Sequence, residues 1–96
     1  MIIHLALFRW KPDIPNAAVD QALERVRRLQ DVCDGIDIFC GQNTHPDAKG
    51  FTHGVVVVAR DQAALDRYRQ HPDHQDVAEK IEAIEEDSLG FDFPDR

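Results

Sequence analysis

Apolar residues recur with the spacing of a strand in some segments and with the spacing of a helix in others. The order of these segments predicts which parts of the chain form strands and which form helices. Residues 2–10, IIHLALFRW, are rich in branched and aromatic residues and contain no turn former, as expected of a strand. Residues 36–43, residues 51–60 and a short segment at residues 88–94 have a similar character. The chain therefore carries four candidate strands, and the third is almost continuously apolar from Val55 onward.

Helical spacing fills the two long intervals between these strands. The first helix is expected to follow Asn16, a good N-cap residue, and to stop at Gly35. A second helical region starts after Asp61, and Pro72 divides it because proline cannot donate a helix hydrogen bond. The apolar stripe of the first helix consists of Val19, Ala22, Leu23, Val26, Leu29 and Cys33.

The order of the elements is strand, helix, strand, strand, helix, strand. This is the split βαβ pattern of ferredoxin-like folds. The expected fold class is α+β, a ferredoxin-like βαββαβ protomer with a four-stranded antiparallel sheet and a second helix broken at Pro72. The 96 residues are expected to form one domain, residues 1–96, since a single core is commonly built from about 100 to 200 residues.

Both faces of the first strand are apolar, although helices can cover only one face of the sheet. Side chains alternate along a strand, so His4 shares its face with Ala6 and Phe8 while the residues between them point the other way. The uncovered face would exceed the few hundred Å² of apolar patch that monomers usually expose. We therefore predict a homodimer, a dimeric α/β barrel formed sheet to sheet through Ile3, Leu5, Leu7, Val56 and Val58.

Charge and composition narrow the choice of partners. The formal net charge is −7 at pH 7, whereas nucleic-acid binding needs Lys and Arg to displace counterions, so no nucleic-acid partner is expected. The longest apolar run, residues 55–59, is too short to span a membrane, and MIIHLALF is followed by Arg9 rather than by a cleavage site. A cytoplasmic protein is expected, with Cys33 and Cys40 as buried, reduced thiols.

Two histidines lie on strands that the fold places at the centre of the sheet. His4 is the third residue of the strand at 2–10, and His53 is the third residue of the strand at 51–60. We expect these two strands to be adjacent and parallel, which would set the imidazoles side by side. Either one alone could be a core histidine with one hydrogen bond, but two together favour a polar site, since burying an unpartnered polar group costs roughly 1 to 3 kcal/mol.

The segment YRQHPDH, residues 68–74, adds three more candidates. Tyr68 lies on the apolar side of its helix and should face the sheet, unless its hydroxyl merely reaches solvent or a backbone carbonyl. His74 follows the bend at Pro72 and either turns toward Tyr68 or lies exposed at a helix N-terminus. His71 is either a C-terminal helix residue favoured by the helix dipole or a substrate-binding group.

Other kinds of site have weaker support. The proline forbids the unbroken helix on which metal ligands at i and i+4 converge, and no carboxylate or cysteine cluster completes a metal site, so no metal is expected. Motifs of nucleophilic catalysis and phosphate binding, GxSxG and GxGxxG among them, are absent from the sequence. Acid–base chemistry by histidine and tyrosine remains, and it needs no cofactor.

Several segments together resemble one known family. HLALFRWK, the GxN at residues 41–43, GFTHGVVVV, YRQHPDH and the terminal FDF resemble, in this order, the stress-responsive α/β-barrel (Dabb) domain family. This family includes polyketide cyclases of the olivetolic acid cyclase type. The resemblance runs nearly end to end and implies a homodimer joined through its sheets, with a pocket between sheet and helices.

The resemblance also implies roles for single residues. His74 would be the general base, Tyr68 would steady a developing enolate or carbonyl oxygen, and His4 and His53 would line the pocket. The implied reaction is an aldol-type condensation of a β-keto or aromatic-precursor substrate, a small hydrophobic or aromatic ligand. The first helix lacks the bulky aromatics that shape the alkyl pocket of the plant cyclase, so the same substrate is not expected.

Three alternatives to a cyclase-like enzyme stay open. One is a cofactor-independent monooxygenase acting on phenolic substrates, with Trp10 lining the pocket rather than filling a core position. The others are a non-enzymatic, stress-responsive homodimer and a small-molecule binder without turnover. They differ in whether His4, His53, Tyr68 and His74 converge on a cavity.

Overall fold

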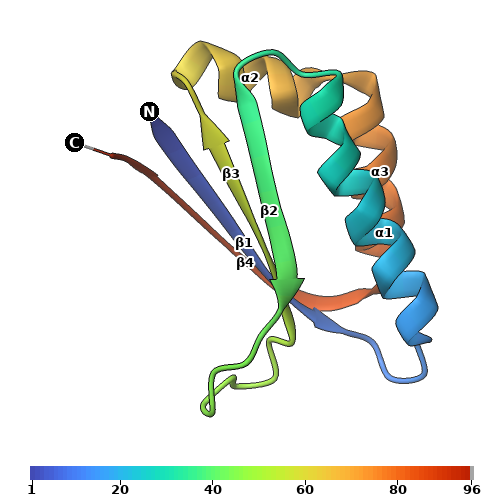
Figure 1. The fold of residues 1–96 in the computed structure, drawn as a ribbon. Coiled ribbons are helices and arrows are strands. Elements are labelled where there is room, and N and C mark those ends of the chain that lie inside the picture. Colours follow the sequence, from blue (N-terminus) through green and yellow to red (C-terminus); the bar gives the residue numbers. More distant parts are fainter. Residues whose placement is uncertain (96) are drawn as a thin grey trace.

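Strands and helices alternate as the sequence predicts (Figure 1). The computed structural model describes residues 1–95. None of the helices in this part of the chain has the length and apolar character needed to cross a membrane. The elements are β1 (Ile2–Trp10), α1 (Asn16–Arg28), the 3-10 helix η1 (Leu29–Asp31), β2 (Ile36–Gln42), β3 (His53–Ala59), α2 (Gln62–Gln70), α3 (Pro72–Ile84) and β4 (Glu85–Pro94).

The four strands form one antiparallel sheet in the order β2-β3-β1-β4. This topology confirms the predicted ferredoxin-like βαββαβ fold. The prediction that β1 and β3 are parallel is wrong: the crossover through α1 leaves β2 parallel to β1, and the hairpin that follows reverses β3. His4 therefore lies opposite Val57, whereas His53 lies opposite Phe8, and the two imidazoles are not side by side.

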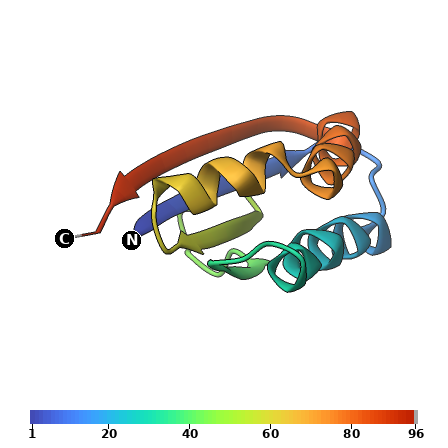
Figure 2. The ribbon, with the colours of Figure 1, turned by 90° about the horizontal axis from the view of Figure 1, so that it is seen from above.

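The helices pack on one face of the sheet and bury the core there. The helix layer beside the sheet is visible in Figure 1, and Figure 2 shows it from above. Side chains of β2 and β3 that face the helices are almost inaccessible, with Val57 fully buried. Ile2, Ala6 and Trp10 of β1 pack against this core with partial exposure, as their predicted face requires.

The helix ends depart from the prediction at α1 and agree with it at α2. Asn16 is the first residue of α1 rather than its cap, since Pro15 takes the extended cap conformation and no side chain caps the helix. The helix ends before Cys33, and Gly35, with φ of +73°, turns the chain into β2. At α2, the Asp61 carboxylate accepts a hydrogen bond from the backbone N–H of Ala64 at 2.8 Å, as a cap should.

Pro72 breaks the second helical region as predicted. It is the first residue of α3, where its missing N–H is not needed and its fixed φ suits the helix. His71, the residue before it, is extended, with φ of −62° and ψ of 133°, because the proline ring disfavours a helical conformation for the preceding residue. The chain therefore leaves α2, changes direction at His71 and enters α3.

The opposite face of the sheet carries no helix and is apolar. Strand β4 begins at Glu85, three residues earlier than predicted, and its long edge adds to this face. The register places the strand residues in rows across the sheet, so that Leu5 lies between Val56 and Phe91. The open sheet face consists of Ile3, Leu5, Leu7, Phe39, Val56, Val58, Leu89, Phe91 and Phe93.

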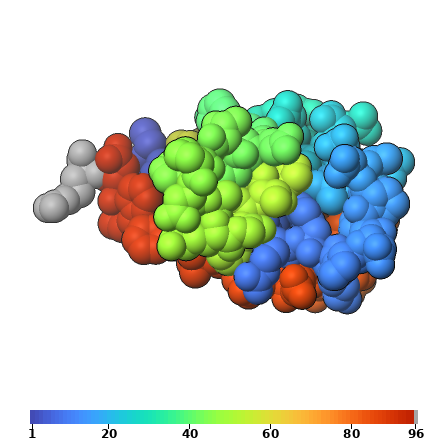
Figure 3. Space-filling model, turned by 90° about the horizontal axis from the view of Figure 1, so that it is seen from below, coloured from blue at the N-terminus to red at the C-terminus, as the bar shows by residue number. Residues whose placement is uncertain are grey.

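The connection between β2 and β3 lies at one end of the sheet. Figure 3 shows it, in green, on the lower surface of the molecule. The Asn43 side chain fixes it by donating to the Phe51 carbonyl at 2.7 Å and accepting from the His45 backbone N–H at 2.8 Å. The loop therefore lies away from the junction of α2 and α3.

Candidate functional site

A cavity of about 200 Å³ lies between α1, α3 and the helix-facing side of β1, β3 and β4. Its middle is apolar, while polar side chains lie at its two ends. Of the predicted site residues, His4, Tyr68 and His74 line it. The complete lining is His4, Ala6, Phe8, Val26, Leu29, Val55, Tyr68, His74, Val77, Ala78, Ile81, Glu82, Glu85 and Ser88.

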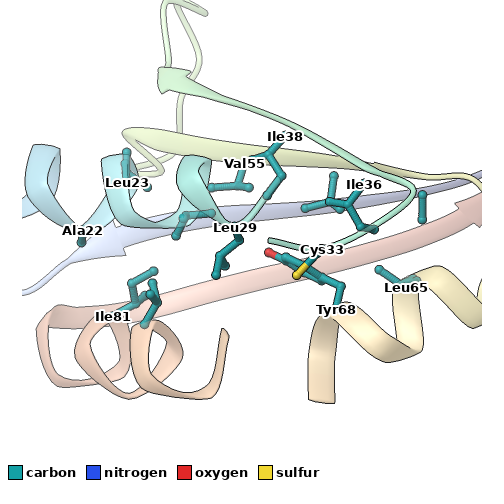
Figure 4. Close-up of a cluster of buried hydrophobic side chains, with 14 of the residues drawn as sticks. Ala22, Leu23, Leu29, Cys33, Ile36, Ile38, Val55, Leu65, Tyr68 and Ile81 are labelled. Carbon is teal, nitrogen blue, oxygen red and sulfur yellow. The ribbon is translucent and has the colours of Figure 1, made fainter. Parts of the chain in front are cut away.

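Tyr68 and His74 meet across the junction of α2 and α3. Their ring centroids are 4.6 Å apart and the ring planes are inclined by 64°, an edge-to-face contact. Tyr68 is 3% exposed. Figure 4 shows its ring reaching from α2 into the buried side chains, beside Cys33. The break at Pro72 thus brings two titratable side chains of YRQHPDH together at one end of the cavity.

Burial keeps both members of this pair uncharged near neutral pH. Burial raises the pKa of Tyr68 well above its ordinary value, and the nearby Cys33 thiol adds to the shift. Burial lowers the pKa of His74, and the positive charges of His4 and Arg69 lower it further, against a smaller opposing effect of the Arg69 backbone carbonyl. The site therefore holds a neutral phenol beside a neutral imidazole.

The two nitrogens of His74 have different surroundings. Nδ1 is buried and makes no well-formed hydrogen bond to any group in residues 1–95. The side chain nevertheless lines the cavity. Because Nδ1 is closed off, a ligand in the cavity meets the ring through its other atoms.

A three-residue cluster holds the other histidine of the cavity. His4 Nδ1 lies 2.5 Å from one oxygen of Asp92, its register partner on β4. The second Asp92 oxygen accepts a hydrogen bond from Arg69 Nη2, also at 2.5 Å. Because a carboxylate can only accept a hydrogen bond, His4 Nδ1 donates to Asp92, which leaves His4 Nε2 for other contacts.

Arg69 and Asp92 were not identified from the sequence. Burial alone would raise the pKa of Asp92, but the hydrogen bonds from Arg69 and His4 and their positive charges outweigh it, so the pKa lies below its ordinary value. The signal was in FDF: Asp92 alternates with two phenylalanines of the open sheet face and must point toward the helices. An antiparallel register would have set it opposite His4.

His53 lies at the other end of the sheet, outside the cavity. Its Nδ1 accepts a hydrogen bond from the Trp10 indole N–H at 3.0 Å and lies 2.8 Å from the Thr52 hydroxyl oxygen. Trp10 also stacks on Phe8, with ring centroids 5.2 Å apart, and does not line the cavity. The expectation that His53 lies beside His4 is therefore wrong, because the two strands run in opposite directions. The substrate-binding role of His53 stays a prediction.

His71 lies outside the cavity as well. Its ring Nδ1 accepts a hydrogen bond from the backbone N–H of Asp73 at 3.1 Å, and so caps α3. His71 is also the C-cap of α2, where its backbone N–H donates to the Tyr68 carbonyl, so this residue ends one helix and begins the next. Its role in substrate binding stays a prediction.

Metal-binding side chains do not cluster in the described part of the chain. Within residues 1–95, no group of three or more His, Cys, Asp or Glu side chains is placed to hold a metal ion. Cys33 and Cys40 are both free thiols; Cys33 is buried and Cys40 is half-buried. Burial raises the pKa of Cys33, so this thiol stays protonated.

A comparison with models of protein families shows to which family the chain belongs. The model of the stress-responsive A/B barrel domain, Dabb, matches residues 2–95. The chain belongs to the Dabb family. No curated protein matches the sequence.

Solved structures with the same fold include proteins of different description. A Dabb family protein with a ferredoxin-like fold from Mesorhizobium loti is 23% identical, with a TM-score of 0.82 over 99% of this Dabb chain and 96% of that one. A hydroxynitrile lyase from Passiflora edulis is 18% identical, with a TM-score of 0.87 over 96% and 90%. A dimeric ferredoxin-like protein of unknown function from Thermobifida fusca is 24% identical, with a TM-score of 0.84 over 96% and 88%. These similarities show the fold of this Dabb chain.

The lowered pKa of His74 predicts a specific pH dependence of stability. The folded chain binds a proton at His74 less readily than the unfolded chain, whose histidine pKa is about 6.5. Stability is therefore fully present above about pH 6.5 and is lost as the pH falls through the window between 6.5 and the lower folded pKa. We expect the free energy of unfolding, measured with urea, to fall more steeply from pH 7 to pH 5 in the wild type than in His74→Gln.

The difference between the two proteins isolates this histidine. Burial also lowers the pKa of His53, but His53 is present in both and its contribution cancels. Parallel curves for the two proteins would contradict the assignment of a buried, neutral His74.

Proposed function

We propose that this Dabb chain is an acid–base enzyme that makes or breaks a carbon–carbon bond next to the carbonyl group of a small, mostly apolar compound. His74 is the base, and Tyr68 donates a hydrogen bond to the carbonyl oxygen. The observation that carries the proposal is the edge-to-face contact of these two neutral side chains at the end of an otherwise apolar cavity. A neutral imidazole and a neutral phenol are the forms that this chemistry needs.

The two nitrogens of His74 have different roles in this proposal. Nδ1 is buried and has no hydrogen-bond partner among residues 1–95, and we place the hydrogen of the neutral ring on this nitrogen. With the hydrogen on Nδ1, the lone pair of Nε2 is free to accept a proton from a ligand.

The bonds balance without a further reactant. In the condensing direction, His74 Nε2 takes the proton from the carbon next to the carbonyl, and the resulting enolate oxygen keeps the hydrogen bond from Tyr68. The enolate carbon then attacks a second carbonyl carbon, and the new alkoxide recovers the proton from His74. In the cleaving direction the same base takes the proton of a hydroxyl, and the carbonyl forms as the carbon–carbon bond breaks. The electron pair of that bond stays on the departing carbon, an enolate or a cyanide, which takes the proton back from His74.

The cavity size favours a compact substrate. A volume of about 200 Å³ is below the range of roughly 300 to 1,000 Å³ usual for drug-sized ligands and is near the ~150 Å³ that holds benzene. One small ring or a short chain fits better than an extended polyketide on a carrier. A hydroxynitrile lyase shares the fold, and a hydroxynitrile is similarly compact; it has no carbonyl group of its own but yields one when its carbon–carbon bond breaks.

The test compares variants of the two side chains on compact substrates. We expect His74→Ala and Tyr68→Phe each to lower kcat by about a hundredfold to ten-thousandfold, the usual contribution of a positioned acid or base. Two reactions probe both directions: exchange of the α-protons of small ketones in D₂O, followed by NMR, and cleavage of aromatic hydroxynitriles.

Controls separate chemistry from folding. His45→Ala, in the exposed loop between β2 and β3, removes a histidine far from the cavity and should keep the wild-type rates. Rates that are the same in the wild type, His74→Ala and Tyr68→Phe would rule out the catalytic assignment. Binding without turnover in all of them would favour a small-molecule binder.

We also propose that the chain works as a homodimer joined through the open sheet face, in the cytoplasm as predicted. Four side chains of this face are widely exposed in the protomer: Phe39 at 62%, Phe91 at 59%, Leu89 at 53% and Phe93 at 41%. An apolar patch of this kind marks an interface in a protein of this size. Similarly folded proteins, the Thermobifida fusca one among them, are described as dimeric.

A charge placed in the open sheet face should separate the protomers. The chain mass is 10.9 kDa, so the wild type should sediment at micromolar concentration as a species of twice this mass. Phe91→Glu should shift it to the monomer, because burying an unpaired carboxylate at an interface is costly. Val32→Glu is the matched control, since Val32 is similarly exposed, at 53%, but lies in the turn after η1. A monomeric wild type, or the same shift in both variants, would contradict this interface.

A further inference from the structure

His4 offers one free ring nitrogen to the cavity. Its Nδ1 is engaged, since it lies 2.5 Å from an oxygen of Asp92 and 3.2 Å from Arg69 Nη2. Its Nε2 makes no hydrogen bond within residues 1–95, yet it is not enclosed by protein atoms as His74 Nδ1 is. The His4 side chain is 19% exposed and lines the cavity. Nε2 therefore reaches space that a ligand can occupy.

The charge of Asp92 decides which ring nitrogen of His4 carries the hydrogen. Burial would raise the pKa of this carboxyl group, but the hydrogen bonds from Arg69 and His4 hold its pKa below the ordinary value. Asp92 is therefore a carboxylate that can only accept, and the hydrogen of a neutral His4 ring lies on Nδ1. Nε2 then carries a lone pair, so it accepts hydrogen bonds and does not donate them.

Arg69 holds the carboxylate in this orientation. Its Nη2 donates to the second Asp92 oxygen at 2.5 Å, while the first oxygen faces His4. A guanidinium can only donate, so the atom of residue 92 that faces Arg69 must be an acceptor. The three side chains come from β1, α2 and β4 and hold the imidazole at the wall of the cavity.

We propose that His4 Nε2 is a second polar subsite of the cavity, which accepts a hydrogen bond from a hydroxyl group of the substrate. The inference rests on the proposed function, because it concerns the same cavity and leaves the reacting carbonyl to Tyr68 and His74. The substrate is then a compact, mostly apolar carbonyl compound that carries a hydroxyl group in addition to the reacting groups. A ligand with only an acceptor in this place leaves two lone pairs facing each other and binds more weakly.

Ligands of equal size test the subsite. The hydroxymethyl group of 3-hydroxymethylacetophenone can donate a hydrogen bond, whereas the methoxy group of 3-methoxyacetophenone can only accept one, and the para isomers form a second pair. Affinities are measured by calorimetry at pH 8, above the ordinary histidine pKa of about 6.5. His4→Leu is the reference, since it shows how the two groups bind without a hydrogen bond from residue 4.

We expect the wild type to favour the hydroxymethyl compound of at least one pair. Its affinity ratio, hydroxymethyl over methoxy, should exceed that of His4→Leu by about three- to tenfold, the usual net effect of one hydrogen bond. The same ratio in the wild type and in His4→Leu, for both pairs, would overturn the inference.

Asp92→Asn should invert the subsite without removing it. Because Arg69 can only donate, the new amide oxygen faces the guanidinium and the amide nitrogen faces His4 Nδ1. The amide then donates to Nδ1, and the hydrogen of the ring moves to Nε2. The ligand preference should therefore reverse in favour of the methoxy compound. A cluster that only joins α2 to β4 would produce no such reversal.

The position of the ring hydrogen can be measured without a ligand. The ¹⁵N shifts of the His4 imidazole at pH 8 should show the hydrogen on Nδ1 in the wild type and on Nε2 in Asp92→Asn. A wild-type ring with its hydrogen on Nε2, or with both nitrogens protonated, would overturn the inference even if the variants fold poorly.

Asp87→Asn is the matched control. It removes the same charge from the same strand, and its carboxylate also accepts from an arginine, Arg9, at 3.3 Å, but Asp87 does not line the cavity. The ligand preference and the His4 hydrogen should stay as in the wild type. A reversal in this variant as well would assign the effect to net charge and overturn the inference.

The outcomes also separate this inference from the proposed function. His74→Ala should lose turnover and keep the preference for the hydroxymethyl ligand. Turnover that depends on His74 without any such preference would overturn the His4 subsite alone. A preference without His74-dependent turnover would overturn the proposed reaction, while the absence of binding by all four ligands would overturn both.

Discussion

Proline is tolerated in the first turn of a helix but not in its interior. The arrangement of the candidate site depends on this constraint at Pro72. In an unbroken helix, residues 68 and 74 would lie about 9 Å apart along the axis and about 120° apart around it. The observed ring centroids are 4.6 Å apart. His71 supplies the extended residue that proline demands before it, and then caps α3 with its own ring. One backbone restriction therefore both ends α2 and sets His74 against Tyr68.

The sheet provides the second half of the arrangement. Because β4 runs antiparallel to β1, Asp92 comes opposite His4, and Arg69 from the last turn of α2 reaches the same carboxylate. The contact joins α2 to the edge strand beside the cavity. It also places a positive charge near His74, which together with burial keeps that imidazole neutral. The strand register thus determines the packing of α2 on the edge strand and the charge that lies near His74.

The sequence predicted the fold well, since its strands and helices have distinct periods and Pro72 leaves little choice of break. It also predicted that His4 faces the helices, because face follows from strand alternation, and that Tyr68 faces the sheet, because it lies on the apolar side of its helix. It could not place His53, since alternation gives the face of a strand residue but says nothing about its level along the neighbouring strand. That level depends on strand direction, and the direction was taken wrongly. Asp92 was missed for the same reason, since its position opposite His4 also depends on strand direction. Arg69 was missed because a contact between the last turn of a helix and an edge strand leaves no periodic signal.

The central claim is that His74 acts as the base, and a base needs an unprotonated nitrogen that faces the cavity. The protonation state of the two His74 nitrogens therefore tests this claim. The ¹⁵N NMR shifts of its imidazole, recorded at pH 7.5 on the labelled wild type and assigned with His74→Gln, report both nitrogens separately. The account predicts a neutral ring with the hydrogen on the buried Nδ1 and an unprotonated Nε2. A hydrogen on Nε2, or a doubly protonated ring at this pH, would contradict it.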